Sequence, residues 1–283
     1  MTAKLPKGWP EDRPMAVCIN IPLEWWPEGV APGVSPFGNP LRNDVVDTAA
    51  RQWAEYGLNV GIYRLADIAE SFGFKFSCHA SGILFDERPE LMRRVHEGGH
   101  EIMAHCWTQH RLLCYMDRDE EDREMKRCAE AQEKLLGERP LGFAVPRGML
   151  SENTEELMAA NGYQFYADDM SGDMPKIKQT GAGPVVCIPY DMEVNDLAFH
   201  LRHGNRLMLL PEIVGDIMDG YPRIGSPPTV LDLGFHAHVS GRIAGSIQFL
   251  KVMEILARTP FAWVTTRTEI ARLMLAEHAE RQG

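Results

Sequence analysis

The sequence of 283 residues lacks the features that mark several classes of protein. It contains no run of five or more Lys and Arg, and its formal net charge is -11, which argues against nucleic acids and anionic membrane surfaces as partners. It contains no apolar run long enough to span a bilayer, and residues 1–14 have no apolar stretch typical of a secretory signal. These absences predict a cytoplasmic protein whose partner is a small molecule.

Cysteine pairs and glycine-rich phosphate loops are also missing. The six cysteines form no CxxC pair, and four of them lie in apolar or strand-like runs, so buried reduced thiols are expected in place of zinc ligands or disulfides. No GxGxxG follows a candidate strand, so a dinucleotide site has no support. No repeat, low-complexity tract or linker divides the chain, and a single domain is predicted.

Short apolar runs alternate with segments of helical period. The expected strands are 15–21, 74–80, 100–106, 142–146, 163–169, 184–190, 230–237 and 261–266, and the clearest expected helices are 90–98, 120–137, 151–162 and 245–259. Strand–helix alternation over about eight units predicts an α/β fold with a mainly parallel sheet. At this length a TIM-like (β/α) barrel of about seven to eight strands is favoured, with an open doubly wound sheet as the alternative.

Polar residues gather where the expected strands end. They are Asn20, Glu24, His105, Gln109, His110, Arg147, Asp168, Asp169, Tyr190, Asn195, Asp196, His236 and His238. In a (β/α) barrel the carboxyl ends of the strands form one rim, and catalytic groups are placed there. This accumulation predicts an active site on that rim.

Three histidines follow one another at five-residue steps in GGHEIMAHCWTQH: His100, His105 and His110. Helical neighbours lie three or four residues apart, and residues on one face of a strand lie two apart, so no regular element points all three at one ion. A loop after a strand can still gather two of them. His100 begins its strand and is expected to orient backbone or to pack against the barrel wall.

Several segments resemble the NodB-homology polysaccharide deacetylases, and most closely the branch of cofactor-independent allantoinases and related cyclic amide hydrolases. The segments that carry the resemblance are GGHEIMAH (98–105), EYGLNVGIYRLADIAESFGF (55–74), RPLGFAVPRGMLSENTEELMAANGYQFYADDMSGDMP (139–175), IPYDMEVND (188–196) and the region 233–273. The resemblance implies a distorted barrel over residues 15–275, an N-terminal extension (1–14) and a C-terminal tail (276–283). It also implies hydrolysis of a C–N bond that is not a peptide bond.

The departures from the family pattern concern its metal site. Metal-dependent members carry two aspartates after the first strand and two histidines spaced H-x-x-x-H, whereas this chain has Asn20 and Pro22 at the first pair and His105 with Gln109 at the second. A catalytic metal needs three protein ligands and an open position. We therefore expect no metal and no cofactor. A zinc site rebuilt from Glu24, His105 and His110 is the alternative.

Without a metal, side chains must activate water, stabilise an oxyanion and protonate the leaving nitrogen. Glu24 is the candidate general base, and the two tryptophans after it are expected to raise its pKa toward neutrality. His236 is expected to pass a proton to the leaving nitrogen, and His105 to donate to the substrate carbonyl. Arg147 is expected to bind a carbonyl or carboxylate.

A second set of residues is expected to contact the substrate: Asn20, Trp107, Gln109, His110, Asp169, Tyr190, Asn195 and His238. Trp107 is expected to lie against a flat ring, and Asp169 to orient Arg147 or to serve a turn. The segment 215–230 is rich in Pro and Gly, which predicts a stiff, non-helical path that either joins subunits or covers the pocket. The resemblance to cyclic amide hydrolases implies a homo-oligomer, and a stiff path is unsuited to a free lid, so the subunit interface is favoured.

The sequence thus predicts a hydrolase that opens a small cyclic ureide or imide without a metal. A metal-dependent N-deacetylase of a small or sugar amide is one alternative. A catalytically degenerate family member that binds a ligand is the other.

Overall fold

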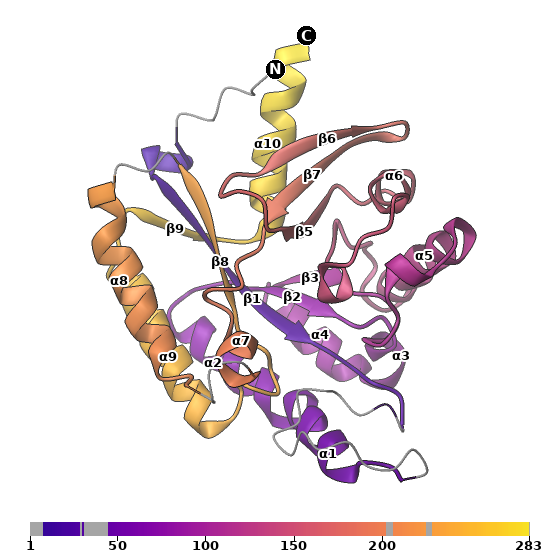
Figure 1. Cartoon of the computed structure of the whole chain (residues 1–283), viewed down its shortest axis with the longest axis horizontal. Coiled ribbons are helices and arrows are strands. Elements are labelled where there is room, and N and C mark those ends of the chain that lie inside the picture. Colours follow the sequence, from indigo (N-terminus) through magenta and orange to yellow (C-terminus); the bar gives the residue numbers. More distant parts are fainter. Residues whose placement is uncertain (1–7, 29, 31–44, 202–205, 225–227, 283) are drawn as a thin grey trace.

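The computed structural model of the chain describes residues 8–28, 30, 45–201, 206–224 and 228–282 (Figure 1). Its described part holds a sheet of nine strands in the order β6-β7-β5-β4-β3-β2-β1-β8, with β9 paired to β1. The strands are β1 (Met15–Leu23), β2 (Ser77–Ala80), β3 (Glu101–Ala104), β4 (Gly142–Phe143), β5 (Phe165–Asp169), β6 (Lys176–Thr180), β7 (Gly183–Pro189), β8 (Thr229–Gly234) and β9 (Ala262–Thr265).

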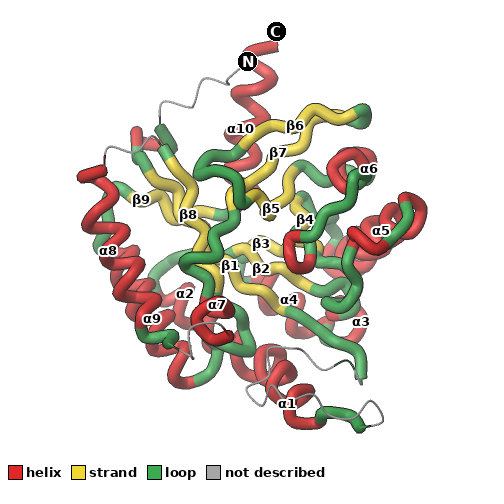
Figure 2. The backbone as a smooth tube through the Cα atoms, viewed as in Figure 1, coloured by secondary structure: helices red, strands yellow, loops and turns green. Residues whose placement is uncertain are grey.

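Helices cover the outside of this sheet (Figure 2). They are α1 (Thr48–Tyr56), a π-helical turn at Gly57–Gly61, α2 (Ile62–Ser71), α3 (Leu84–Glu87), α4 (Pro89–Glu97), α5 (Arg118–Leu136), α6 (Thr154–Ala160), α7 (Asp196–Leu201), α8 (Leu209–Ile224), α9 (Ile243–Ala257) and α10 (Arg267–Gln282). None of the helices in these ranges is both long and apolar enough to cross a membrane.

The sheet curls into a distorted barrel, which confirms the predicted fold. All strand pairs are parallel except β6 with β7, which form a hairpin. Between β7 and β8 the barrel is held by one parallel bridge, Asn195 with Gly234, and by the hydrogen bond from Gly234 N to Val194 O (3.1 Å). The carboxyl ends of the parallel strands therefore share one rim.

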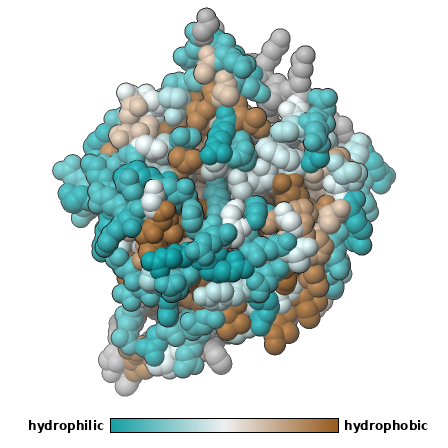
Figure 3. Space-filling view, turned by 180° about the vertical axis from the view of Figure 1, so that it is seen from behind, coloured by the Kyte–Doolittle hydropathy of each residue, from teal (hydrophilic) through white to brown (hydrophobic). Residues whose placement is uncertain are grey.

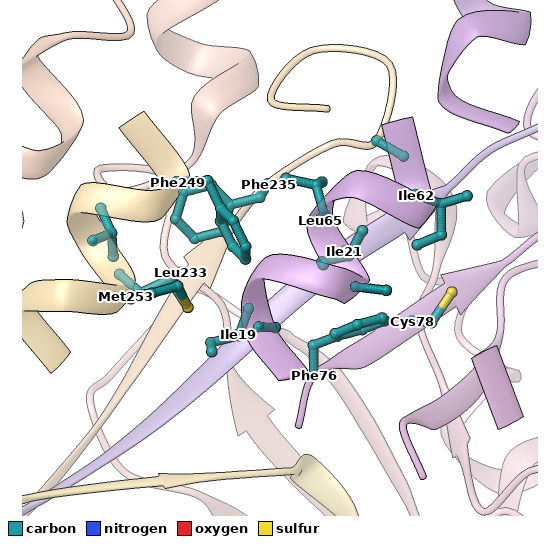
Figure 4. Close-up of a cluster of buried hydrophobic side chains, with 14 of the residues drawn as sticks. Ile19, Ile21, Ile62, Leu65, Phe76, Cys78, Leu233, Phe235, Phe249 and Met253 are labelled. Atoms are coloured by element: carbon teal, nitrogen blue, oxygen red, sulfur yellow. The ribbon is translucent and has the colours of Figure 1, made fainter. Parts of the chain in front are cut away.

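Side chains of β1 alternate between two cores. Ile19 and Ile21 point outward into the apolar layer that α2 and α9 cover, where Leu65 and Phe249 also lie (Figure 4). The opposite parity points into the barrel, whose lower part contains Cys18 and other apolar side chains. Asn20 and Pro22 continue this inward row, so β1 brings polar chemistry to the barrel interior only near its carboxyl end.

Most element predictions are confirmed, with shorter strands than expected. Gly162 has φ +83 and ends the helix α6 in the left-handed region, as its sequence predicts. The strand β6 was not predicted, because KIKQT is polar and lies on the edge of the sheet with an exposed face. Five of the six cysteines are buried, with Cys114 half-buried.

The predicted non-helical path over 215–230 is wrong for residues 215–224, which belong to α8. Val214, Met218 and Tyr221 are buried at helical spacing, so tertiary packing outweighs the glycines, and Pro222 lies in the last turn where it interrupts little. Residues 225–227 lie outside the described residues. The subunit interface that rested on a non-helical segment stays a prediction.

The long helix α5 does more than present a polar face to solvent (Figure 3). Glu124 accepts a hydrogen bond from Trp107 N (2.7 Å) and forms an ion pair with Arg111, whose Nε lies 2.9 Å from the carboxylate. Glu121 is fully buried and accepts from the hydroxyls of Ser151 and Thr154. These carboxylates hold the loops that follow β3 and β4, both of which reach the rim.

Candidate active site

A cavity of about 640 Å³ opens at the carboxyl ends of the strands. Eight of the residues predicted for the site line it: Glu24, His105, Gln109, His110, Arg147, Tyr190, Asn195 and His236. Asp168, expected at the rim, lines it too. Residues that were not predicted from the sequence also line the cavity, among them Pro22, His79 and an apolar group made of Leu112, Val145, Met170, Met192, Leu197, Ala198 and Leu201. The structure thus gathers residues that follow six different strands into one space.

Glu24 follows β1 and is only 7% exposed. Its Oε1 accepts a hydrogen bond from Gln109 Nε2 (2.5 Å) and lies 3.9 Å from His105 Nε2, and its Oε2 lies 3.9 Å from His238 Nε2. Burial raises the pKa of this carboxyl, but the surrounding histidines outweigh burial and lower its pKa to about 2. The predicted upward shift of this pKa is wrong, because the histidines around the carboxyl lower its pKa by more than burial raises it.

His105 follows β3, and one of its ring nitrogens is already engaged. Nδ1 donates to the backbone carbonyl of Ala144 (2.7 Å), so Nδ1 carries a proton. The other nitrogen, Nε2, faces Glu24 across the cavity floor. His105 therefore has one nitrogen free for a substrate, a water molecule or the carboxylate.

His236 and Asp196 form a buried pair on the opposite side. His236 Nδ1 lies 2.7 Å from Asp196 Oδ1, and Asp196 Oδ2 accepts from His236 N (2.8 Å) and Ser240 Oγ (2.6 Å). Burial lowers the pKa of His236, but the charge and hydrogen bond of Asp196 outweigh burial, so the pKa is raised. The bond at Nδ1 fixes the ring and leaves Nε2 to face the cavity.

The rim carries two further charged groups. Arg147 is exposed, has a left-handed backbone (φ 61) in the turn before Gly148, and makes no ion pair with the described residues. Asp168, at the end of β5, accepts from Val145 N (2.9 Å), and burial raises its pKa to about 6. The rim aspartate that reaches the cavity is thus Asp168.

Four of the predicted substrate contacts lie elsewhere. Asp169 pairs with Lys176 Nζ (2.8 Å) and does not orient Arg147. Trp107 is 8% exposed and lies under Arg127, whose Cζ is 3.5 Å from the ring centroid, so it is not a wall of the cavity. Both side chains were expected near the substrate because they follow strand ends, but each turns toward an outer helix or strand.

Asn20 and His238 lie behind the cavity surface. Asn20 is fully buried beneath the floor, and neither its Oδ1 nor its Nδ2 has a hydrogen-bond partner in the described part of the chain. His238 packs edge-on against Trp26 and Trp53 behind Glu24. His238 therefore shapes the surroundings of Glu24 instead of lining the cavity.

The donors at the rim do not fit the metal site of metal-dependent deacetylases. Pro22 lines the cavity but offers no ligand atom, and Gln109 uses its amide nitrogen on Glu24. In the alternative site, His110 Nδ1 is bonded to Thr108 Oγ1 (2.9 Å). Among the residues the structure describes, no three His, Cys, Asp or Glu side chains come close enough together to hold a metal ion.

A buried polar layer below the floor was missed. Arg267 and Asp232 are both fully buried and form an ion pair, and Arg267 also contacts His79, which lies on β2. Two signals in the sequence point to this layer: Asp232 interrupts an apolar strand, and it has the same strand parity as His236. His79 shares no such signal, because SCHA reads as an ordinary buried strand.

Comparison with known proteins agrees with this geometry. Residues 55–166 match the family profile of polysaccharide deacetylases. A Schizosaccharomyces pombe protein of that family is 24% identical over 87% of this chain and 81% of its own. A family member from Pseudomonas aeruginosa PAO1 has a similar structure, with a TM-score of 0.83, 24% identity and coverage of 95% and 94%. PuuE allantoinase gives a TM-score of 0.85, 25% identity and coverage of 98% and 95%.

The family match covers residues 55–166, and the chain as a whole is similar in fold to proteins of the polysaccharide deacetylase (NodB) superfamily. Within that superfamily its structure is similar to that of PuuE allantoinase over nearly its whole length. The predicted enzyme class, a hydrolase of C–N bonds other than peptide bonds, is confirmed by the same comparisons.

Proposed function

We propose that the chain hydrolyses a small cyclic amide, a ureide or an imide, with His236, Asp196 and Glu24 and without a metal. The observation that carries the proposal is the buried carboxylate–histidine pair whose free Nε2 faces a cavity that also contains an ionised carboxylate. This pairing is the arrangement by which proteins hold a histidine in one tautomer for proton transfer.

The proton transfers assign His236 the role first expected of Glu24. Neutral His236 takes a proton from water at Nε2 as the water oxygen attacks the substrate carbonyl. The resulting imidazolium, stabilised by Asp196, gives the proton to the ring nitrogen as the C–N bond breaks. Proton transfer is most efficient when the pKa of the base lies near the working pH, so Glu24, with a pKa near 2, is a weak base.

Glu24 acts in this mechanism as a fixed anion. Its oxygens accept hydrogen bonds from the attacking water or from an N–H of the ureide or imide, and its charge stabilises the imidazolium that forms on His236. Gln109 holds the carboxylate in place through its amide nitrogen. Arg147, a cation at the rim that forms no ion pair with the described residues, binds a second carbonyl of the ring.

Size and surface of the cavity favour a small substrate. Sites for small molecules commonly measure about 300–1,000 Å³, and the cavity falls in that range. Met170, Met192 and Leu201 give its mouth an apolar, partly exposed surface. A glycan would need polar partners for its hydroxyl groups along the mouth, whereas this surface suits a compact ring.

N-deacetylation of a small or sugar amide remains the second candidate, because a Helicobacter pylori peptidoglycan deacetylase is 25% identical over 51% of this chain and 49% of its own. The two candidates separate in a hydrolysis screen over allantoin, hydantoins, cyclic imides and N-acetylated amines. We expect turnover of the cyclic compounds. Turnover of N-acetylated amines alone would support the deacetylase, and ligand binding without any turnover would support a degenerate member.

Two glutamate variants link the screen to the site. Glu24→Gln keeps the shape of the side chain but removes the anion that stabilises the imidazolium formed on His236, and it should lower kcat by about 10²–10³-fold, as loss of one preorganised electrostatic contact does. Glu28→Gln is the matched control, since Glu28 is exposed and forms an ion pair with Arg51 on the surface (2.7 Å), and the kcat of this variant should equal that of the wild type. Equal kcat values for Glu24→Gln and the wild type would remove Glu24 from the mechanism.

A further inference from the structure

His79 lies on the cavity floor but belongs to no part of the proposed proton transfer. It follows Ser77 on the inward face of β2, is paired with Pro22 of β1 in register, and is 3% exposed. Its ring centroid lies 5.7 Å from that of His105. A buried histidine in contact with the reacting space therefore has a role to be explained.

One nitrogen of His79 is held by an arginine. Arg267 Nη1 lies 2.6 Å from His79 Nε2. A guanidinium can only donate hydrogen bonds, so His79 Nε2 must accept, and the proton of the neutral ring must be on Nδ1. The contact therefore fixes the tautomer of His79.

Arg267 is itself fixed from below. Its Nη2 donates to Asp232 Oδ1, and its Nη1 lies against Met103 Sδ (3.8 Å). Arg267 and Asp232 are both fully buried, so neither side chain has solvent to turn into. Burial and the permanent positive charge of Arg267 both disfavour a second proton on His79. Together they lower the pKa of His79 well below its usual value.

The remaining nitrogen reaches the cavity. No hydrogen bond within the described chain engages His79 Nδ1, and this atom is not among the buried polar atoms that lack a partner, so it is accessible from the cavity that His79 lines. The other titratable groups facing the ring are His105 and His236, and neither of them supplies a negative charge that would favour a second proton on His79. His79 is thus a neutral donor that lines the same cavity as the anion Glu24.

We propose that His79 is a catalytic residue that donates a hydrogen bond from Nδ1–H to the carbonyl oxygen of the substrate and to the oxyanion that replaces it. This inference rests on the proposed amide hydrolysis. His105 was first expected to donate to the substrate carbonyl, but its Nδ1–H donates to the backbone carbonyl of Ala144 and its Nε2 faces Glu24. His79 is therefore the better placed donor. A donor fixed before the substrate arrives needs no reorganisation as negative charge develops.

The first measurement reads the tautomer directly. In protein labelled with ¹⁵N-histidine, the ring signal that disappears in His79→Gln belongs to His79. We expect it to show a neutral ring with the proton on Nδ1 from about pH 5 to 8.5, as its depressed pKa requires. A proton on Nε2, or a second protonation within this range, would overturn the assignment without any reference to activity.

Two replacements separate the donor from the contact with Arg267. Asn places an amide N–H close to the position of Nδ1, whereas Gln reaches the position of Nε2 and keeps a partner for Arg267. We expect His79→Gln to lower kcat by about 10²–10³-fold, as loss of one oxyanion donor does, and His79→Asn to stay within about tenfold of the wild type. Equal losses in both variants, or a change in KM alone, would leave His79 a structural residue.

Binding of a probe distinguishes this inference from the proposed function. Succinimide is added to the Glu24→Gln variant, in which turnover is slow, and the His79 Nδ1–H signal is followed. If the signal shifts but the wild-type protein hydrolyses no amide, His79 does donate to a carbonyl and the proposed hydrolysis is wrong. If the signal does not shift but the wild-type protein hydrolyses succinimide, the proposed hydrolysis stands and the role of His79 as carbonyl donor is wrong.

Discussion

At the scale of single residues, the site depends on charges that neutralise one another without contact with solvent. Asp196 has no exposed surface and receives three hydrogen bonds, two of them from His236. Burial lowers the pKa of the imidazole of His236, but the charge and the hydrogen bond of Asp196 outweigh burial and raise it. The same residues then determine how activity depends on pH.

His236 must be neutral to accept a proton from water, so activity falls as the pH decreases through its raised pKa. Asp196→Asn removes the charge that raises this pKa, and the acidic limb of kcat/KM should move down by about 1–3 pH units. The maximal rate should fall as well, because the tautomer of His236 is no longer fixed. Glu24 contributes no limb in this range, since its pKa is near 2.

Ser240→Ala is the control for this prediction. It removes one hydrogen bond from Asp196 and leaves the charge beside His236 in place, so the acidic limb should keep its position. A limb that does not move in Asp196→Asn would mean that another group, such as Asp168 with its pKa raised to about 6, controls the pH dependence.

The sequence shows which residues reach the rim but not which way their pKa values shift. Placement follows from strand ends, which the periodicity of the chain reveals, and so eight of the predicted residues do line the cavity. The pKa of Glu24 depends on His105 and His238, distant in the sequence, and the tautomer of His79 depends on Arg267. Such partners are brought together by the closure of the barrel, which local patterns do not encode.

At the scale of elements, apolar periodicity identifies the buried strands and the long helices, and fails where packing overrides composition. The helix α8 forms despite Gly215 and Gly220 because its buried face packs beside α9. The edge strand β6 forms because β7 offers it a partner, although its own residues are polar. Neither outcome is visible in a window of neighbouring residues.

The π-helical turn between α1 and α2 supports the loop that carries His236 and His238. A Cβ at Gly61 would lie 2.0 Å from the carbonyl oxygen of Ala237, which is backbone and cannot move aside cheaply. Gly61→Ala should therefore lower the free energy of unfolding by about 1–3 kcal/mol or more, as overpacking does. It should also displace the loop after β8 and lower kcat.

Gly220→Ala is the matched substitution in another helix. Among the described residues, no atom beyond the backbone of the helix itself lies within 4 Å of a Cβ at Gly220, so the variant should be as stable as the wild type or gain up to about 1 kcal/mol from helix propensity. Urea denaturation of both variants provides the measurement. Equal midpoints for Gly61→Ala and Gly220→Ala would contradict the close approach of this turn to the loop.

At the scale of the whole molecule, the barrel converts residues from nearly its full length into one site. Glu24, His105 and His236 span more than two hundred positions of sequence, yet all follow inward-facing ends of parallel strands. The helix α10 (Arg267–Gln282) runs through most of the expected C-terminal tail at 276–283. The solved structures of similar proteins share this barrel, and the chemistry proposed for this chain depends on the side chains at its rim.

The most direct measurement of that chemistry is hydrolysis by metal-free protein. The protein is dialysed against a strong chelator, its zinc, iron, cobalt, nickel and manganese are determined by mass spectrometry, and hydrolysis of the cyclic amides is then measured with and without added zinc. We predict full activity with less than about one metal ion per hundred chains, because side chains alone transfer the proton. Loss of activity on chelation, restored by about one zinc ion per chain, would contradict the metal-free mechanism and return Glu24, His105 and His110 to the role of ligands.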